Sequence, residues 1–107
     1  MLSSKDRAVV EQFQHLMQER GVPVLETIVF GSRARGDTDK DSDLDVLVLV
    51  KRRDRQVREQ VRHCAWEVGF DEGLFIQTVV LTPEEAEHSP ERSSLLMQAV
   101  RLEGVRV

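Results

Sequence analysis

The sequence has one cysteine, no long apolar run and no start that resembles a leader. Cys64 alone cannot form an internal disulfide, and no second cysteine or histidine group stands at the spacing of zinc ligands. No segment approaches the roughly 18 apolar residues of a membrane span, and the first residues, MLSSKDR, lack the basic and then apolar pattern of a signal peptide. The single cysteine excludes an internal disulfide scaffold, and these absences disfavour a structural zinc site and a membrane protein, so we expect a soluble cytoplasmic protein.

The chain also has fewer basic residues than a protein that binds a long nucleic acid would need. The chain carries 15 Lys and Arg against 19 Asp and Glu, a formal net charge of −4, whereas such binding depends on many cationic contacts to phosphates. We therefore expect no extended nucleic-acid partner, and any bound nucleotide to be small. Basic residues do cluster after position 50, and we interpret them as the solvated face of a helix: Lys51, Arg52, Arg53, Arg55, Arg58 and Arg62.

Apolar periodicity predicts an α/β protein. The chain has 107 residues, of which 40% are hydrophobic, and we expect one domain over residues 1–107. The patterns predict helices over 4–20, 54–69 and 89–104, the start of another within 82–86, and strands over 24–30, 44–50 and 74–81. Between them, GSRARG (31–36) suits one helical turn, DTDKDS (37–42) a loop and FDEG (70–73) a turn. The order predicts helices packed against a small sheet.

Two aspartates stand at the start of the most apolar predicted strand. Asp43 and Asp45 are two residues apart, so on a strand they project to the same side. Two like charges held together are unfavourable without a cation, and Mg²⁺ takes one or two carboxylates together with water and phosphate oxygens. A calcium loop counted from Asp37 is disfavoured, because its sixth residue is Ser42 rather than glycine and its twelfth is Val48 rather than glutamate. Two interpretations of the pair remain open: a polar entrance to a buried strand, or a magnesium site that serves a nucleoside triphosphate.

A glycine and a serine follow the first predicted strand and complement the acidic pair. Gly31 and Ser32 would open a short helix whose free N–H groups favour a phosphate, and Ser32 could add a hydroxyl donor. Arg33 or Arg35 would neutralise charge on a leaving pyrophosphate. This segment therefore predicts the phosphate-binding half of the same site.

Together these residues resemble a known family. Gly31-Ser32, ten further residues and Asp43-Leu44-Asp45 resemble the signature of the DNA polymerase β-like nucleotidyltransferases, and GSRARG with DSDLD is similar to the minimal nucleotidyltransferases. The resemblance implies the nucleotidyltransferase fold, a small mixed sheet flanked by helices. It also implies that Asp43 and Asp45 carry Mg²⁺ and catalysis, and that nucleotide binding falls to Gly31, Ser32, Arg33, Arg35 and Ser42.

The same resemblance implies a reaction and a partner. An acceptor hydroxyl would attack the α-phosphorus of a nucleoside triphosphate in line, here transferring AMP from Mg·ATP and releasing pyrophosphate. Family members of this size commonly work beside a helical HEPN-type protein, as the antitoxin of a toxin–antitoxin pair that modifies the toxin. In a different interpretation, the protein keeps the nucleotide site but neutralises its partner by binding alone. Transfer to a small molecule is disfavoured, because no acceptor-binding domain is recognisable.

One departure from the family pattern concerns catalysis. The family usually places a third carboxylate on the next core strand, but LFIQTVVL (74–81) has no acid. Gln77 is the closest match by strand position and Thr78 the alternative register, while Asp71 or Glu72 could substitute from the preceding turn. A glutamine cannot take a proton near neutral pH. The expected consequence is nucleotide binding with weakened or lost catalysis.

Trp66 lies away from the apolar stripe of its predicted helix. Two interpretations remain open: an exposed tryptophan that contacts a partner, or a ring that folds back against a loop such as the one around Phe70. With an unpaired sheet edge, an exposed Trp66 would also be compatible with a homodimer.

Overall fold

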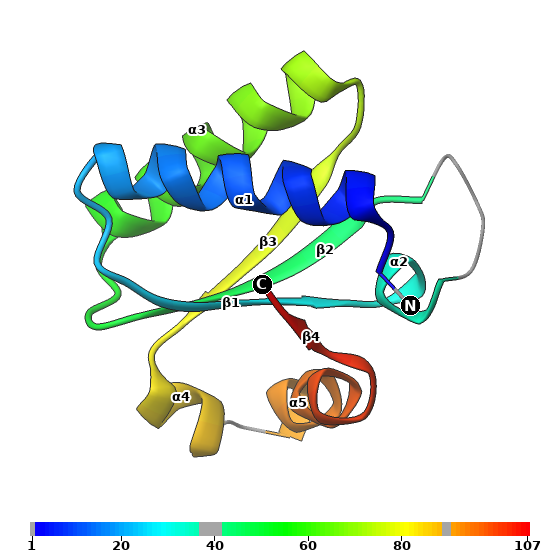
Figure 1. Cartoon of the computed structure of the whole chain (residues 1–107). Coiled ribbons are helices and arrows are strands. Elements are labelled where there is room, and N and C mark those ends of the chain that lie inside the picture. The colour runs from blue at the N-terminus through cyan, green and yellow to red at the C-terminus, as the bar shows by residue number, and fades with distance from the viewer. Residues whose placement is uncertain (1, 37–41, 89–90) are drawn as a thin grey trace.

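The computed structural model describes residues 2–36, 42–88 and 91–107. Its elements are, in chain order, α1 (Ser4–Glu19), β1 (Val24–Phe30), α2 (Ser32–Arg35), β2 (Leu44–Val50), α3 (Arg55–Glu72), β3 (Ile76–Leu81), α4 (Pro83–Glu87), α5 (Glu91–Glu103) and β4 (Val105–Arg106) (Figure 1). The predicted loop over 37–42 lies, apart from Ser42, outside the described residues, as does Pro90 in the last predicted helix.

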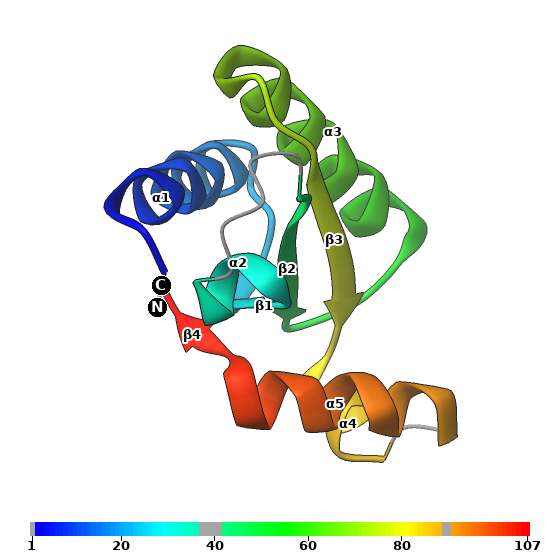
Figure 2. The same ribbon diagram turned by 90° about the vertical axis from the view of Figure 1, so that its right-hand side faces the viewer.

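Four strands form one mixed sheet in the order β3-β2-β1-β4. β1 is antiparallel to β2 and to β4, and β2 is parallel to β3. This small mixed sheet flanked by helices confirms the predicted fold class (Figure 2). The sequence pattern does not predict β4, because two residues are too few to show alternation. β4 joins β1 through the pairs Ile28↔Arg106 and Val29↔Val105.

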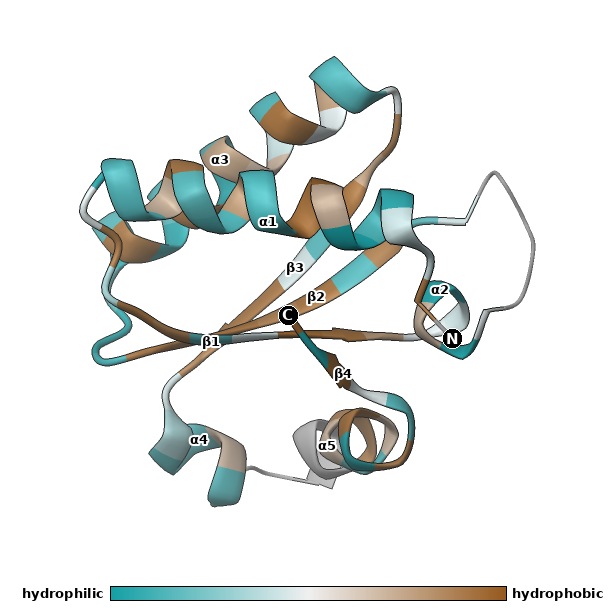
Figure 3. Ribbon diagram, in the orientation of Figure 1, coloured by the Kyte–Doolittle hydropathy of each residue, from teal (hydrophilic) through white to brown (hydrophobic). Residues whose placement is uncertain are grey.

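Helices cover both faces of the sheet, α1 and α3 on one side and α4 and α5 on the other (Figure 1). In β2, Leu44, Val46 and Val48 join the buried cluster on the α1–α3 side, whereas Leu47 packs with Val100 of α5 on the opposite side. This double burial explains the continuous apolar run of β2, whose strand is mainly brown in Figure 3. In the part of the chain that the structure describes, no helix has the length and apolar character of a membrane span.

The end of α3 differs from the sequence prediction. The helix continues through Glu72, so the predicted end at Gly69 and the predicted turn over 70–73 are wrong. Gly69 lies inside the helix, and a Cβ there would meet the backbone carbonyl of Leu74. The glycine therefore allows close packing against the chain entering β3, and the αL residue Gly73 ends the helix. β3 begins at Ile76, two residues later than predicted.

Candidate active site

Asp43 and Asp45 lie at the start of β2. Asp43 directly precedes the strand and is exposed, while Asp45 is its second residue and is half-buried. Asp45 pairs with Phe30 of β1 and with Gln77 of β3. Leu47, two residues further on, packs on the α5 side of the sheet. Because residues two apart and directly paired residues share a face, Asp45 and Gln77 also project to that side.

The two carboxylates interact electrostatically. Burial raises the pKa of Asp45, and the nearby charge of Asp43 raises it further. Among the described residues, no three His, Cys, Asp or Glu side chains form a group that could hold a metal. A cation bound here would therefore use these two carboxylates, and water or substrate oxygens would complete its coordination. Mg²⁺ is commonly bound in that way, so the residues present fit it.

Gly31 brings the two halves of the sequence motif together. It connects β1 to α2 with φ 79° and ψ −161°, a conformation that residues with a side chain rarely adopt. A Cβ at this position would collide with Oδ2 of Asp45 and lie 3.3 Å from its carboxyl carbon. The Gly-Ser turn therefore lies directly against the acidic pair, and only a residue without a side chain fits between them.

Gly31→Ala is expected to lower the free energy of unfolding by about 1–3 kcal/mol and to weaken Mg²⁺-dependent nucleotide binding, because its methyl group displaces the Asp45 carboxylate. Gly21→Ala is the matched control, since Gly21 has φ 76° but no atom within 4 Å of an added Cβ. The control should lose stability and keep its nucleotide affinity. Urea unfolding and titration with a fluorescent ATP analogue measure both quantities. Unchanged affinity in Gly31→Ala would contradict this role of Gly31.

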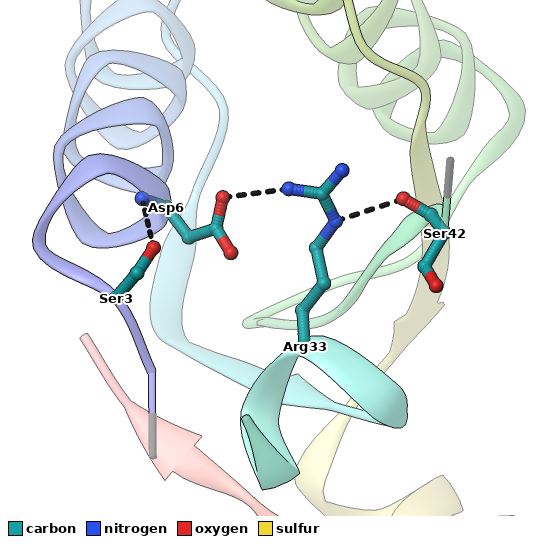
Figure 4. Close-up of polar contacts among 4 residues, drawn as sticks. All are labelled: Ser3, Asp6, Arg33 and Ser42. Carbon is teal, nitrogen blue, oxygen red and sulfur yellow. Dashed lines mark hydrogen bonds and ion pairs between the residues drawn. The ribbon is translucent and has the colours of Figure 1, made fainter. Parts of the chain in front are cut away.

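Arg33 connects three segments around the site (Figure 4). Its Nε donates a 2.8 Å hydrogen bond to the backbone carbonyl of Ser42, and its Nη1 lies 2.8 Å from Oδ1 of Asp6 in α1. The side chains of Arg33 and Asp6 are 14% and 9% exposed. The Ser3 hydroxyl caps α1 by accepting from the Asp6 backbone N–H. The Arg33 side chain thus links α1 to the residue before Asp43, and nucleotide binding by Arg33 stays a prediction.

The sequence does not single out Asp6. An acid in the first turn of a helix is ordinarily assigned to its N-terminus, where it interacts favourably with the helix dipole. The burial of Asp6, to 7% exposure, becomes visible only once α2 is placed beside α1.

The other predicted nucleotide-binding residues take different positions relative to the acidic pair. Ser32 begins α2 and is half-buried, and Ser42 directly precedes Asp43. Arg35 turns toward α5, where its Nη1 lies 2.9 Å from Oε2 of Glu103. The structure thus brings Gly31, Ser32 and Ser42 to the acidic pair and directs Arg35 to the end of α5.

The register of β3 decides between the two candidates for the third position. Gln77 pairs with Asp45, and Thr78 pairs with Val46. Gln77 is therefore the residue beside the acidic pair, as its strand position predicts. Asp71 and Glu72 belong to the last turn of α3 rather than to a turn before β3, and neither forms a three-residue metal group with the pair among the described residues.

A hollow of about 540 Å³ opens beside Asp43. Arg33 and Ser42 line it on the polar side, and Phe70 and Phe75 line it on the other. Both phenylalanines are largely exposed, at 73% and 60%. The sequence does not assign them to the site, because they come from the end of α3 and the entry to β3. Asp43 therefore has an aromatic wall beside it.

Comparison with known proteins identifies relatives across most of the chain. A family model described as a nucleotidyltransferase domain matches residues 10–102. The bifunctional uridylyltransferase/uridylyl-removing enzymes of Burkholderia mallei (strain SAVP1) and Burkholderia pseudomallei (strain 668) are each 30% identical over 110 residues, which covers 97% of this chain. The chain spans 13% of the length of these curated relatives.

Solved structures share the fold. A toxin–antitoxin crystal structure with AMP-PNP matches with a TM-score of 0.65 and 18% identity, over 90% of this chain and 69% of that chain. A proposed minimal nucleotidyltransferase matches with a TM-score of 0.60 and 25% identity, over 100% of this chain and 97% of that chain. At 18% identity, the first likeness concerns the fold alone.

Proposed function

Because the chain belongs to the nucleotidyltransferase domain family, we propose that it transfers AMP from Mg·ATP to a hydroxyl group of a partner protein. Residues 1–107 would act as one domain. The observation that carries the proposal is the packing of Gly31 against the Asp45 carboxylate. That contact places the Gly31-Ser32 turn, which would bind phosphate, beside the Asp43 and Asp45 carboxylates, which are suited to Mg²⁺.

The proposed reaction assigns a task to each group at the site. Asp43 and Asp45 hold Mg²⁺, which when bound would neutralise charge on the phosphates. Gly31 leaves room for the Asp45 carboxylate beside the Gly-Ser turn. The Ser32 hydroxyl donates to a phosphate, Arg33 and Ser42 complete the nucleotide contacts, and Arg35 would join them on leaving its ion pair with Glu103. The acceptor oxygen bonds to the α-phosphorus, the bond from that phosphorus to the bridging oxygen breaks, and pyrophosphate leaves with the electron pair. The hydroxyl proton passes to water, since Gln77 cannot accept it.

The choice of nucleotide and partner draws support from the structural neighbours. One neighbour is a toxin–antitoxin crystal structure with AMP-PNP, an analogue of ATP, and another is a variant of the toxin–antitoxin complex MntA-HpeT. We therefore propose that the chain is the antitoxin of such a pair and that a helical HEPN-type toxin is the acceptor.

A second candidate function is neutralisation of the partner by binding alone. The observation that favours it is Gln77 in register with Asp45, where a carboxylate would assist catalysis. In this case the nucleotide site would bind Mg·ATP and turn it over slowly or not at all.

Intact-mass analysis separates the two candidates. The chain is expressed together with the helical protein that co-purifies with it, and the complex is incubated with Mg²⁺ and ATP. We expect the mass of the partner to increase by one AMP group, because the site supplies both Mg²⁺ ligands and the Gly31-Ser32 turn for the phosphate. The Asp43→Asn, Asp45→Asn double variant serves as the inactive control. A stable complex without added mass supports neutralisation by binding, and the absence of both a complex and a modification would contradict both candidates.

A further inference from the structure

β3 is a free edge of the sheet in the described structure. Within the described residues it pairs with β2 alone, and β4 forms the opposite edge by pairing with part of β1. Its six residues, IQTVVL, include no proline and no charge, the features that commonly protect an edge from pairing with another chain. A strand of this length extends about 17–20 Å, which is enough to pair with a short extended segment of a second protein.

A groove runs between this free edge and α3, and we call it the α3–β3 groove. A hollow of about 780 Å³ is lined by residues 78–81 and by the first turns of α3. A second hollow, of about 350 Å³, shares Arg62 and Thr78 with the first and contains Gln77. It shares Phe70 and Phe75 with the hollow beside Asp43. The groove therefore follows β3 to the candidate active site, and Figure 2 shows β3 at the sheet edge beside α3.

The α3 wall of the groove is basic. Four arginines line the first hollow: Arg53, Arg55, Arg58 and Arg62. Arg53 forms an ion pair with Glu85, and Arg55 forms one with Glu59. Arg58 and Arg62, one helical turn apart and exposed, form no ion pair with any residue in the described ranges. Arg55, Arg58 and Arg62 thus lie on an exposed helix face as predicted, whereas Lys51, Arg52 and Arg53 precede α3, so the prediction is wrong for them.

Exposed aromatic rings form the other end of the groove. Trp66 is 63% exposed and stacks on Phe70, with ring centroids 5.3 Å apart. The ring therefore packs on Phe70, as one interpretation predicts, although Phe70 lies in α3 rather than in a loop. It also faces solvent, and contact with a partner stays a prediction. Phe75 extends the same surface. Adjacent exposed aromatics of this kind are typical of a protein-binding surface.

We propose that the α3–β3 groove binds an extended acidic segment of the acceptor protein as an additional strand of the sheet. The segment's main chain pairs with β3. Because α3 lies over one face of the added strand, alternate acidic side chains reach Arg58 and Arg62, and an apolar residue packs on Trp66. The proposal rests on the proposed function in one respect: the hydroxyl that receives AMP lies at the Asp43 end of the groove.

A second copy of the chain fits the groove less well. Pairing of two β3 edges about a two-fold axis would place Arg58 and Arg62 of both copies side by side, with like charges facing each other. A single-stranded nucleic acid would use the arginines and the aromatics, but it offers no main chain to pair with β3, and Asp54 and Glu59 line the same hollow. An acidic peptide segment satisfies the charges, the rings and the free backbone groups together.

The probe is a fluorescein-labelled peptide of about twelve residues that alternates valine and glutamate and has a central tyrosine. It is titrated by anisotropy against the full chain without Mg²⁺ or nucleotide. We expect saturable binding with a change in the fluorescence of Trp66, the single tryptophan. Replacing every glutamate by lysine should weaken binding at least about tenfold. Arg58→Glu with Arg62→Glu should reverse that preference.

Lys5→Glu with Arg7→Glu is the matched control, because it changes the net charge equally at exposed positions of α1; it should keep the wild-type preference. A peptide with the same side chains and N-methylated backbone amides should lose at least about tenfold in affinity. Equal binding of the N-methylated or lysine peptide would overturn the proposal. So would a dimer in light scattering that the Arg58, Arg62 variant disrupts, or tighter binding of oligothymidylate than of the acidic peptide.

The titration also separates this proposal from the proposed function. Binding is measured without nucleotide, so a protein that binds the peptide but transfers no AMP retains the docking surface and contradicts only the transferase activity. Transfer to the partner by a chain that does not bind the acidic peptide would overturn the docking surface alone.

Discussion

Exchanging Asp43 and Asp45 together for asparagine is expected to abolish Mg²⁺-dependent nucleotide binding and leave the fold intact. These are the two carboxylates that interact at the start of β2, and neutral amides hold a hard divalent cation far more weakly. We expect the affinity for Mg²⁺ to fall by at least about a hundredfold. Isothermal titration with Mg²⁺ and a non-hydrolysable ATP analogue measures this loss directly.

Asp71→Asn with Glu72→Gln is the matched control for that experiment. It removes the same two charges at the end of α3, outside any three-residue metal group of the described chain. The control should bind Mg²⁺ and nucleotide as the wild type does. Wild-type affinity in the Asp43, Asp45 variant would refute the metal site, and a large loss in the control would assign the missing acidic ligand to α3.

The asparagine variant should also be at least as stable as the metal-free wild type. The pKa of Asp45 is raised in the folded protein, so folding disfavours its ionised form. In the wild type this contribution weakens stability as the pH rises from about 4 through the raised pKa of Asp45. Asparagine removes that dependence. Thermal unfolding across this range should therefore show a difference in favour of the variant that grows with pH and disappears on adding Mg²⁺.

Replacing Arg33 with alanine is expected to lower the free energy of unfolding by about 3–5 kcal/mol. The change leaves the carboxylate of Asp6, which is 9% exposed, without the guanidinium group beside it. It also removes the donor to the Ser42 carbonyl. Urea unfolding measures the effect. Arg35→Ala is the comparison, because Arg35 forms a more exposed pair with Glu103, and it should cost no more than about 1 kcal/mol.

A double variant separates the structural role of Arg33 from its role at the site. Asp6→Leu with Arg33→Met replaces the buried ion pair by apolar groups of similar volume, which is often nearly neutral for stability. We expect it to recover most of the stability that Arg33→Ala loses. Mg·ATP affinity should stay reduced, because no donor then holds the Ser42 carbonyl next to Asp43. Wild-type affinity in the double variant would restrict Arg33 to a structural role.

The sequence predicts those parts of the fold that local pattern determines. The bounds of β1 and β2 match the predicted strands, because each is a short apolar run that ends at glycine or charge. The end of α3 is mispredicted for a tertiary reason. Gly69 has the appearance of a helix stop, yet it is buried within the helix so that the backbone before β3 can approach. No local pattern distinguishes a stopping glycine from a packing glycine.

The same distinction applies to the candidate site. Gly31, Asp43 and Asp45 lie at the adjoining ends of β1 and β2, which pair directly. Their spacing in the sequence therefore predicts that they lie close together. Asp6 is separated from Arg33 by 27 positions, and Phe75 reaches the site only through the parallel pairing of β2 and β3. Contacts between distant segments depend on how the elements pack, and single-sequence periodicity does not report that.

The apolar run of β2 has a consequence for the orientation of Asp45 at the start of the strand. If β2 mispaired with β1 by one position, Asp45 would turn toward α1 and α3, and Leu44 and Val46 would turn away from them. Leu44 would then take the exposed position of Asp43 or the half-buried position of Asp45. Exposing its side chain costs up to about 1.5–3 kcal/mol, and a buried unpaired carboxylate would add to that cost. The packing of the hydrophobic core thus fixes the register of β2. It thereby determines the side of the sheet to which Asp45 projects, although the core residues take no part in the reaction.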